Sequence, residues 1–403
     1  MYDSGNIGFM LIATALVMIM TPGLAFFYGG LVGRKNVIGV MIQSFVSMGW
    51  TTFLWWVCGY SLVFSGGQGG FIGDLHYAFL QNVSPGQVFS TANSIPLLVM
   101  FVYQMMFAII TPALITGAFA NRIKFGAYMI FLTLWMFFVY FPVAHNVWGD
   151  GFFAHFWGVL DFAGGTAVHT TAGFAALASV IYVGKRKLID NEPHNIPFVA
   201  LGAGLLWFGW YGFNAGSELK VDNVTILAFA NTDVCASVAA ITWLAIAWTF
   251  EKKPKFVGLL TGAVAGLVAI TPAAGYVSIK SAVAIGVIVS VVCYLAVMFK
   301  NRMGIDDALD VWGVHGVGGV IGCISTGIFA SKFWNPGGAD GLLHGGTHFF
   351  LMETMSVLIV AAYSFVFSYV ALWAINLITP VKASAEEEEM GLDVAEHGEK
   401  AYV

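Results

Sequence analysis

Eleven long apolar stretches follow one another along the chain, separated by short polar connections. They begin near Ile7, Val40, Ile95, Phe125, Gly164, Pro197, Ala228, Phe256, Ser278, Val311 and Phe349. A helix needs about 20 mostly apolar residues to cross the hydrocarbon core of a bilayer. The eighth stretch, which ends near Ile270, is the shortest. The pattern predicts an all-α polytopic membrane protein with eleven transmembrane helices.

The basic residues alternate between the two ends of these predicted helices. Of the 17 Lys and Arg residues, all follow odd-numbered stretches except Lys220, Lys280 and Lys332. Cytoplasmic loops carry an excess of Lys and Arg. The N-terminus is therefore expected outside and the C-terminus in the cytoplasm. A count wrong by one helix would scramble the alternation, so the charges also support eleven.

The overall composition agrees with burial in lipid. Hydrophobic residues make up 59% of the 403 residues and charged residues 10%, whereas soluble domains carry about 25% charged residues. The mean hydropathy is +0.82. So few charges cannot cover a solvated surface, so lipid must cover most of this one, and no nucleic-acid partner is expected. The four cysteines lie in apolar runs without a CxxC pair, which indicates neither a disulfide framework nor a zinc site.

Eleven helices divide naturally into five, five and one. Two consecutive units with an odd number of helices must enter the membrane in opposite directions, which is the inverted-repeat plan. The clearest internal echo is an acid followed by a histidine: Asp161 and His169 open the fifth stretch, and Asp310 and His315 open the tenth. We expect two inverted repeats of five helices plus one additional helix, with the substrate path between the halves.

Ionisable residues within apolar spans are costly and are functional candidates by default. His169 and His315 lie among small and apolar neighbours, one in each half. Their occurrence in both halves favours a functional role over packing, which is the alternative. Asp161 acts either as a cap and charge at the start of the fifth helix or as a stabiliser of a nearby cation. No third His, Cys or carboxylate accompanies the histidines in sequence, so neither a metal nor another cofactor is expected.

The chain after the last apolar stretch is a separate segment. Residues 381–403 contain Glu386 to Glu389, an acidic run that is expected to stay solvated. The segment that follows, GLDVAEHGEKAY, is not of low complexity and indicates a docking motif. A disordered solubilising tail is the alternative.

Several segments resemble signature segments of one family. They are TPGLAFFYGGLVGRKN (21–36), VLDFAGGTAVHTTAG (159–173), GFNAGS (212–217), TPAAGY (271–276), DVWGVHGVGGVIGCISTGIFA (310–330) and GLDVAEHGEKAY (391–402). They resemble ammonium transporters of the ammonium-transporter/methylammonium permease/Rhesus superfamily, in its bacterial or archaeal form. The similarity runs in order from the first span to the tail and covers essentially the whole chain.

The resemblance implies a site for the substrate. Phe107, Trp148 and Ser217 would recruit ammonium at the outer face, with Asp161 as the supporting acid, and Phe107 and Phe213 would form stacked gates below them. On composition alone, the three aromatic residues would be ordinary packing. Position 103 is Tyr where many members of the family carry Phe, and it is given no gating role.

The resemblance also implies how the site is used and where the protein acts. His169 and His315 would be the paired pore histidines. Residues 1–380 would form the transmembrane transporter domain, in a homotrimer with one pore per subunit in the plasma membrane. Residues 381–403 would be a cytoplasmic regulatory tail linked to control by PII-type signalling proteins.

The transport hypothesis is that ammonium loses its proton and ammonia crosses the hydrophobic pore, with the proton relayed or returned. The alternatives are a sensor with little net flux and a neutral ammonia gas channel. An intramembrane enzyme is disfavoured because no Ser-His, paired-Asp or HExxH pattern occurs in a span.

Overall fold

The computed structural model describes residues 2–90, 94–187 and 192–402. Within these ranges the chain is helical, with isolated bridges at Val88–Pro96 and Ile123–Lys382 and no strand. The longer helices are α1 (Ser4–Leu31), α2 (Val37–Leu54), α4 (Leu97–Ile115), α5 (Phe125–Trp135), α7 (Thr171–Val183), α8 (Ile196–Ala215), α9 (Asn223–Glu251), α10 (Phe256–Ile270), α11 (Ile279–Arg302), α12 (Val317–Phe329) and α13 (Thr347–Asn376). The short α-helices are α3 (Tyr60–Phe64), α6 (Phe141–Trp148), α14 (Ala385–Met390) and α15 (Leu392–His397).

Short 3-10 and π-helical segments complete the fold. The π-helical ones are η1 (Trp55–Gly59), η3 (Met136–Tyr140), η4 (Phe153–Trp157), η5 (Gly165–Thr170) and η7 (Trp312–Gly316), and the 3-10 ones are η2 (Ala78–Leu80), η6 (Gly216–Glu218) and η8 (Leu342–His344). Several π-helical turns continue directly into an α-helix. Such turns are frequent at functional sites, and η5 and η7 contain the two histidines.

The predicted membrane helices are confirmed in number and place. The described ranges contain ten continuous helical stretches that are long and apolar enough to cross a membrane. The eleventh is the shorter apolar helix α10, which has 15 residues and is the stretch expected to be shortest. The protein is thus a multi-pass membrane protein of the expected fold class.

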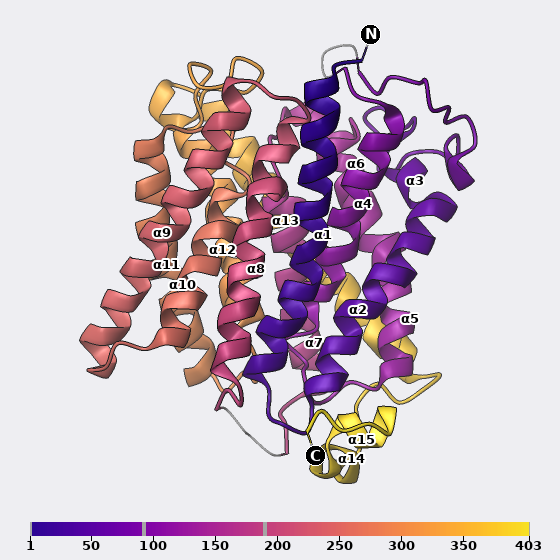
Figure 1. Ribbon diagram of the computed structural model, residues 1–403, viewed down its shortest axis with the longest axis vertical. Coiled ribbons are helices and arrows are strands. Elements are labelled where there is room, and N and C mark those ends of the chain that lie inside the picture. Colours follow the sequence, from indigo (N-terminus) through magenta and orange to yellow (C-terminus); the bar gives the residue numbers. More distant parts are fainter. Residues whose placement is uncertain (1, 91–93, 188–191, 403) are drawn as a thin grey trace.

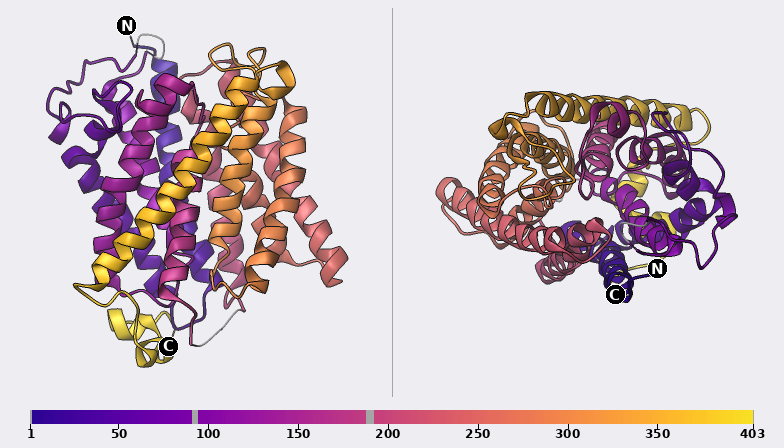
Figure 2. Two further views of the ribbon diagram at one scale, coloured as in Figure 1. Left: turned by 180° about the vertical axis from the view of Figure 1, so that it is seen from behind. Right: turned by 90° about the horizontal axis from the view of Figure 1, so that it is seen from above.

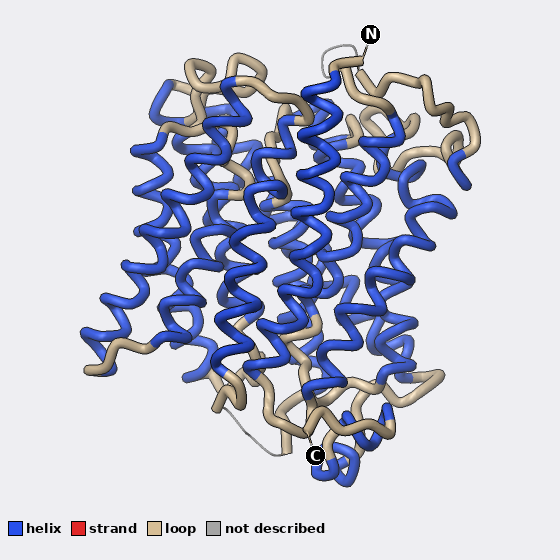
Figure 3. Tube along the Cα trace, viewed as in Figure 1, coloured by secondary structure: helices blue, strands red, loops and turns tan. Residues whose placement is uncertain are grey.

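The helices form one bundle with loops gathered at its two ends (Figure 1, Figure 3). Helices α1 and α8 pack side by side between a group that contains α2 to α6 and a group that contains α9 to α11 (Figure 1, Figure 2). The N-terminus lies at the end opposite the tail helices α14 and α15, as an odd number of crossings requires. Helix α13 runs obliquely across the back of the bundle (Figure 2).

Glycines allow the two halves to approach closely between α1 and α8. A Cβ atom added at Gly202 would lie 2.2 Å from the backbone nitrogen of Phe27. One added at Gly23 would lie 2.9 Å from Leu205 Cβ. Lipid is as apolar as the helix surfaces, so the hydrophobic effect does not drive membrane helices together. Small residues let the backbones approach closely enough for van der Waals packing to hold them.

The internal echo is confirmed, but with a different acid in the second half. Asp161 lies eight residues before His169, and Asp307 lies eight residues before His315. The Asp307 carboxylate accepts hydrogen bonds from the backbone N–H groups of residues 311 and 312. Asp310, the partner expected from the sequence, instead forms an ion pair with Lys300 at 2.5 Å. The alignment expected from the sequence was therefore wrong. It paired Asp161 with the acid nearest to His315, whereas the two halves share the spacing of eight residues between aspartate and histidine.

Backbone geometry supports this corrected alignment. Gly164 and Asp310, each five residues before its histidine, both have positive φ angles, 118° and 58°. Both carbonyl oxygens accept the N–H group four residues later, at 3.0 and 2.9 Å. The same left-handed residue followed by a π-helical turn therefore opens both histidine segments.

The tail is folded against the bundle rather than fully solvated. Helix α14 contains the acidic run, and Glu388 within it is buried and accepts the backbone N–H of Lys187 at 2.8 Å. Asp393 accepts the backbone N–H groups of Val37 and Gly39 at 3.0 and 2.8 Å. These contacts differ from the expectation of a solvated acidic run because the carboxylates satisfy backbone donors of the bundle.

Candidate functional site

Aromatic rings from three helices meet near the end of the bundle that holds the N-terminus. Phe107 of α4 and Phe213 of α8 are stacked with their ring centres 4.2 Å apart. Trp148, the last residue of α6, contacts Phe107 edge to face at 5.9 Å. Phe107 and Phe213 are buried. The structure thus brings together the three aromatic residues that the resemblance implied, with the stack closing the space beneath Trp148.

Ser217 lies one helical turn beyond Phe213, in η6. Its hydroxyl donates to the Phe213 carbonyl at 2.9 Å. Tyr103 lies beside it, with its hydroxyl 3.3 Å from Ser217 Oγ and its ring 5.1 Å from that of Phe107. The Tyr103 hydroxyl also donates to the backbone carbonyls of residues 212 and 213. Because the Ser217 proton points to a carbonyl, the serine oxygen keeps lone pairs for an external donor.

Asp161 joins the aromatic end to the first histidine segment. Its carboxylate accepts the backbone N–H groups of Gly164, Gly165, Thr166 and Ala167 at 2.6 to 3.0 Å. Its own backbone carbonyl accepts the indole N–H of Trp148 at 2.8 Å.

The two interpretations of Asp161 can be weighed on this geometry. Its carboxylate is buried against the start of η5 and acts as a cap for that segment. Its support for the aromatic end runs through its backbone carbonyl. The capping interpretation therefore describes what the side chain does.

The two histidines touch at the centre of the bundle. His169 Nδ1 and His315 Nδ1 are 3.3 Å apart, and the rings are stacked with centres 5.3 Å apart. Both side chains are buried. His169 Nε2 has no hydrogen-bond partner among the described residues. One ring nitrogen of the pair is therefore free to bind a small polar guest.

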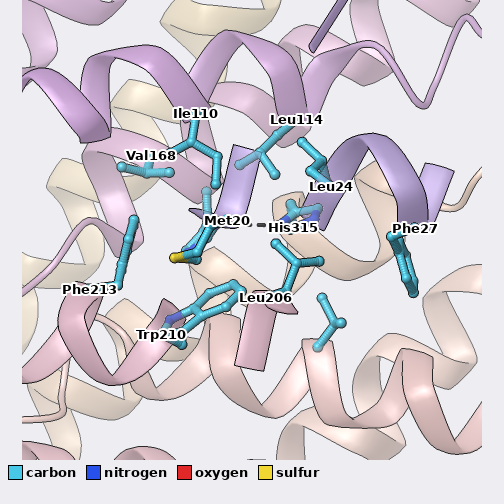
Figure 4. A pocket seen from close by; sticks show the side chains of 12 residues that line it. Met20, Leu24, Phe27, Ile110, Leu114, Val168, Leu206, Trp210, Phe213 and His315 are labelled. Atoms are coloured by element: carbon cyan, nitrogen blue, oxygen red, sulfur yellow. Dashed lines mark hydrogen bonds between the residues drawn. The ribbon is translucent and has the colours of Figure 1, made fainter. Parts of the chain in front are cut away.

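A small cavity surrounds the histidine pair. Its volume is about 10 Å³, near the least that holds one water-sized molecule. Figure 4 shows His315 among apolar side chains, with Phe213 at one side and Trp210 below it. The cavity is lined by Met20, Leu24, Phe27, Ile110, Leu114, Val168, His169, Leu206, Trp210, Phe213, Val264 and His315. Apart from the two imidazoles and one indole, this lining offers no polar side chain.

His315 also lines a larger cavity on the tail side of the bundle. This cavity has a volume of about 690 Å³ and includes Glu192, Glu251, Lys255 and Asp310 in its lining. His169 is not part of it. The pair thus has aromatic rings towards one side and borders, on the other, a wide vestibule with charged residues in a largely apolar lining.

Trp210 is a residue of this site that the sequence did not single out. Its ring stacks on His169 with centres 5.5 Å apart, and its N–H donates to Thr271 at 2.8 Å. Trp210 lies three residues before Phe213, so both rings project from one face of α8. That spacing was the available signal, but tryptophan is also common in the packing of membrane helices.

No group of three or more His, Cys, Asp or Glu residues that could hold a metal ion occurs within the described ranges. The arrangement is a narrow apolar cavity beside two histidines, with aromatic rings at one end and a wide vestibule at the other. Such an architecture defines a membrane channel or transporter for a very small solute.

Comparisons with known proteins identify the family. A profile of the Ammonium Transporter Family matches residues 8–402. The chain is 44% identical to an ammonium transporter of Bacillus subtilis over 402 residues, which is 99% of this chain and 98% of that protein. It is 42% identical to ammonium transporter Amt1 of Archaeoglobus fulgidus over 403 residues, covering 99% of this chain and all of that protein. The chain belongs to the ammonium transporter family, and its activity is ammonium transport.

Solved structures agree with this assignment. Candida albicans Mep2 has a TM-score of 0.89 and 36% identity, and the match covers 100% of this chain and 91% of that one. A structure described as "Sensor Amt Protein" has a TM-score of 0.88 and 30% identity, and the match covers 98% of both chains. The fold expected from the sequence is confirmed by these likenesses.

Proposed function

We propose that the protein captures ammonium at Trp148, Phe107 and Ser217, removes its proton, and conducts ammonia past His169 and His315. The observation that carries this proposal is the contact of the two imidazoles beside a small apolar cavity, with His169 Nε2 unpartnered among the described residues. A passage of this kind favours a neutral guest that can form one or two hydrogen bonds.

Capture depends on cation–π attraction and one hydrogen bond. An aromatic face attracts a cation by about 0.5 to 2 kcal/mol, and more where water is excluded. The Ser217 oxygen accepts a hydrogen bond, which ammonium can donate and potassium cannot. Asp161 supports capture by holding the Trp148 indole through its backbone carbonyl.

Charge must be removed before the apolar cavity is crossed. A bare cation in a low-dielectric interior is far too costly, and burial lowers the pKa of an amine by up to about 3–5 units. Phe107 and Phe213 act as gates, because their stacked rings separate the capture site from the cavity. Ammonium transfers its proton to the histidine pair, in which the centre of the His169 ring lies 6.1 Å from that of Phe213, and ammonia passes when the stacked rings move.

The hydrogen bond between the two histidines makes their outer ring nitrogens unlike. When both rings are neutral, one Nδ1 donates to the other, so one Nε2 carries a proton and the other accepts one. The pair therefore offers ammonia both a donor and an acceptor. When the bare Nε2 takes up a proton, the shared proton moves to the other Nδ1 and the other Nε2 releases its proton, both rings stay neutral and the two roles are exchanged. This is the property required of a proton relay between the two sides of the membrane.

The test is an electrical recording on the purified protein in lipid. We expect a pulse of ammonium to produce a transient current in membranes that contain the protein, because the proton is relayed. Uptake of labelled substrate without current would contradict the relay and favour neutral gas conduction. Neither current nor uptake would favour a sensor with little net flux.

A variant at the capture site tests the first step separately. Trp148→Ala is expected to raise the half-saturating ammonium concentration by about three- to tenfold, because cation–π attraction is lost. Maximal flux should change less. An unchanged half-saturating concentration would contradict capture at Trp148.

We further propose that the protein acts as a homotrimer in the plasma membrane, with the N-terminus outside, residues 1–380 as the transport domain and residues 381–403 as a cytoplasmic regulatory tail. The basic residues near the tail support this orientation. A PII-type signalling protein is the proposed partner of the tail. Deletion of 386–403 should abolish binding of such a protein in a pull-down, and unchanged binding would refute this part.

A further inference from the structure

Glu353 is a buried carboxyl group that the transport steps above do not use. It lies on α13 and its side chain is fully buried. Its Oε2 accepts the backbone N–H of Leu160 at 3.0 Å. Its Oε1 is buried and has no hydrogen-bond partner within the described part of the chain. A buried carboxyl in a membrane helix is costly, so its retention calls for an explanation beyond packing.

The residue that Glu353 holds is next to Asp161. The carbonyl of Asp161 accepts the Trp148 indole, and the carboxylate of Asp161 caps the segment that carries His169. Residues 158–164 are not helical, and Gly158 and Gly164 within them have positive φ angles of 64° and 118°. Such a loop lacks the regular backbone hydrogen bonds of a helix, so its position depends on groups elsewhere in the protein that bind its backbone.

Helix α13 contributes this anchor although it belongs to neither repeat. It crosses the back of the bundle obliquely and packs against α7 and α12, the helices that continue from the two histidine segments (Figure 2). Glu353 is thus the point at which the additional helix binds the loop between Trp148 and His169.

We propose that Glu353 is a positioning residue for ammonium capture. Its carboxyl oxygen holds the backbone of Leu160 and Asp161, and through the Asp161 carbonyl it fixes the Trp148 indole at the outer end of the passage. This inference rests on the proposed capture role of Trp148. It assigns the eleventh helix a part in substrate affinity as well as in packing.

The test compares variants of Glu353 in uptake assays on the whole protein in lipid. Glu353→Met keeps the size and removes the acceptor, and Glu353→Gln keeps an acceptor oxygen. We expect Glu353→Met to raise the half-saturating ammonium concentration about five- to tenfold with a smaller change in maximal flux, because one buried hydrogen bond is lost. Glu353→Gln should stay within about twofold of the wild type. Ser368→Ala, another buried polar position of α13, is the matched control and should change neither quantity.

A double-mutant cycle separates positioning from general stability. Trp148→Phe keeps an aromatic ring but removes the indole N–H that binds Asp161. If Glu353 acts through that bond, adding Glu353→Met to Trp148→Phe should raise the half-saturating concentration little further. Independent, multiplicative effects would overturn the proposal. If Glu353→Met does not fold, Glu353→Asp, which withdraws the carboxyl by one methylene, should give the same shift in affinity.

The outcomes also separate this inference from the proposal on which it rests. A raised half-saturating concentration in Trp148→Ala with a wild-type value in Glu353→Met would refute the positioning role alone. Wild-type values in both would refute capture at Trp148 as well. An equal shift in Glu353→Gln and Glu353→Met would overturn the assigned role of the acceptor oxygen.

Discussion

The segments that carry His169 and His315 share one backbone design and differ in what surrounds them. Each has an aspartate eight residues before the histidine, a left-handed residue, and a π-helical turn. Asp161 caps four backbone N–H groups, whereas Asp307 caps two. The His169 segment has aromatic rings against it, and the His315 segment borders the wide vestibule and has Lys300 beside it.

This difference shows how a symmetric scaffold supports transport in one pathway. The repeated backbone brings the two imidazoles together, because each segment crosses the other at small residues. The surroundings of the two segments differ: aromatic rings lie against the His169 segment, and the His315 segment borders a vestibule with charged residues in its lining.

Removing the capping carboxylate should destabilise the His169 segment more than the His315 segment. Asp161→Ala leaves four buried N–H groups without their acceptor and is expected to cost about 3–4 kcal/mol of unfolding free energy. Asp307→Ala, with two such groups, should cost about half as much. Thermal unfolding and yield of the purified protein in detergent measure both. Equal losses would contradict the inferred difference between the segments.

Removing either imidazole should impair conduction itself. His169→Ala or His315→Ala is expected to lower ammonium current by about a hundredfold or to change its selectivity, since proton transfer by a positioned group is worth about that much. Electrical recording beside the wild type checks this. His344→Ala, at an exposed histidine of the loop before α13, is the control. Wild-type flux and selectivity in both variants would reduce the pair to packing.

The two glycines at which the histidine segments cross, Gly173 and Gly319, should differ in how well they tolerate an added methyl group. A Cβ at Gly173 would lie 2.1 Å from the Gly316 backbone nitrogen, whereas one at Gly319 would lie 2.8 Å from Thr170 Oγ1. Gly173→Ala should therefore destabilise the protein by about 2–3 kcal/mol and separate the histidines, with Gly319→Ala costing about 1–2 kcal/mol. Unfolding midpoints of the two variants test this order, and a larger loss for Gly319→Ala would reverse it.

Acid should weaken the ion pairs of Asp306 with Arg122 and Arg186 and so lower the stability of the fold. Burial raises the pKa of Asp306, but hydrogen bonds from Arg186 and the charges of Arg122 and Arg186 outweigh it, so this pKa lies below its ordinary value. A carboxylate with a lowered pKa stabilises the fold above its unfolded-state pKa, and this contribution is lost as the pH falls through its folded-state pKa. The effect should be about 1 kcal/mol or less, because the Asp306 side chain, which is 11% exposed, lies in a loop where water screens the ion pairs.

The measurement for this last prediction is the unfolding midpoint of the purified protein between pH 7 and pH 3. Asp306→Asn should lower the midpoint at neutral pH and flatten its decline in acid. Asp340→Asn, at the end of the bundle opposite the tail, is the matched control and should leave the acid dependence unchanged. An unaltered acid dependence in Asp306→Asn would exclude this carboxylate as its source.

The sequence by itself determined the eleven helices, their approximate starts, the family and the candidate residues. Each of these depends on local composition or on contiguous segments, and a membrane imposes a strict length on apolar runs. Even the short helix α10 could be predicted, because a membrane helix has a higher hydropathy than the loops on either side of it.

Only the tertiary structure decided which polar residues act together. The contact between His169 and His315 and the stacking of Trp210 on His169 join segments far apart in the chain. The binding of Leu160 by Glu353 does the same. Hydropathy is summed along the chain, whereas hydrogen bonds and ring contacts depend on where helices cross. Small residues determine where the helices cross, and a single segment of sequence does not show which residue on another helix each of them contacts.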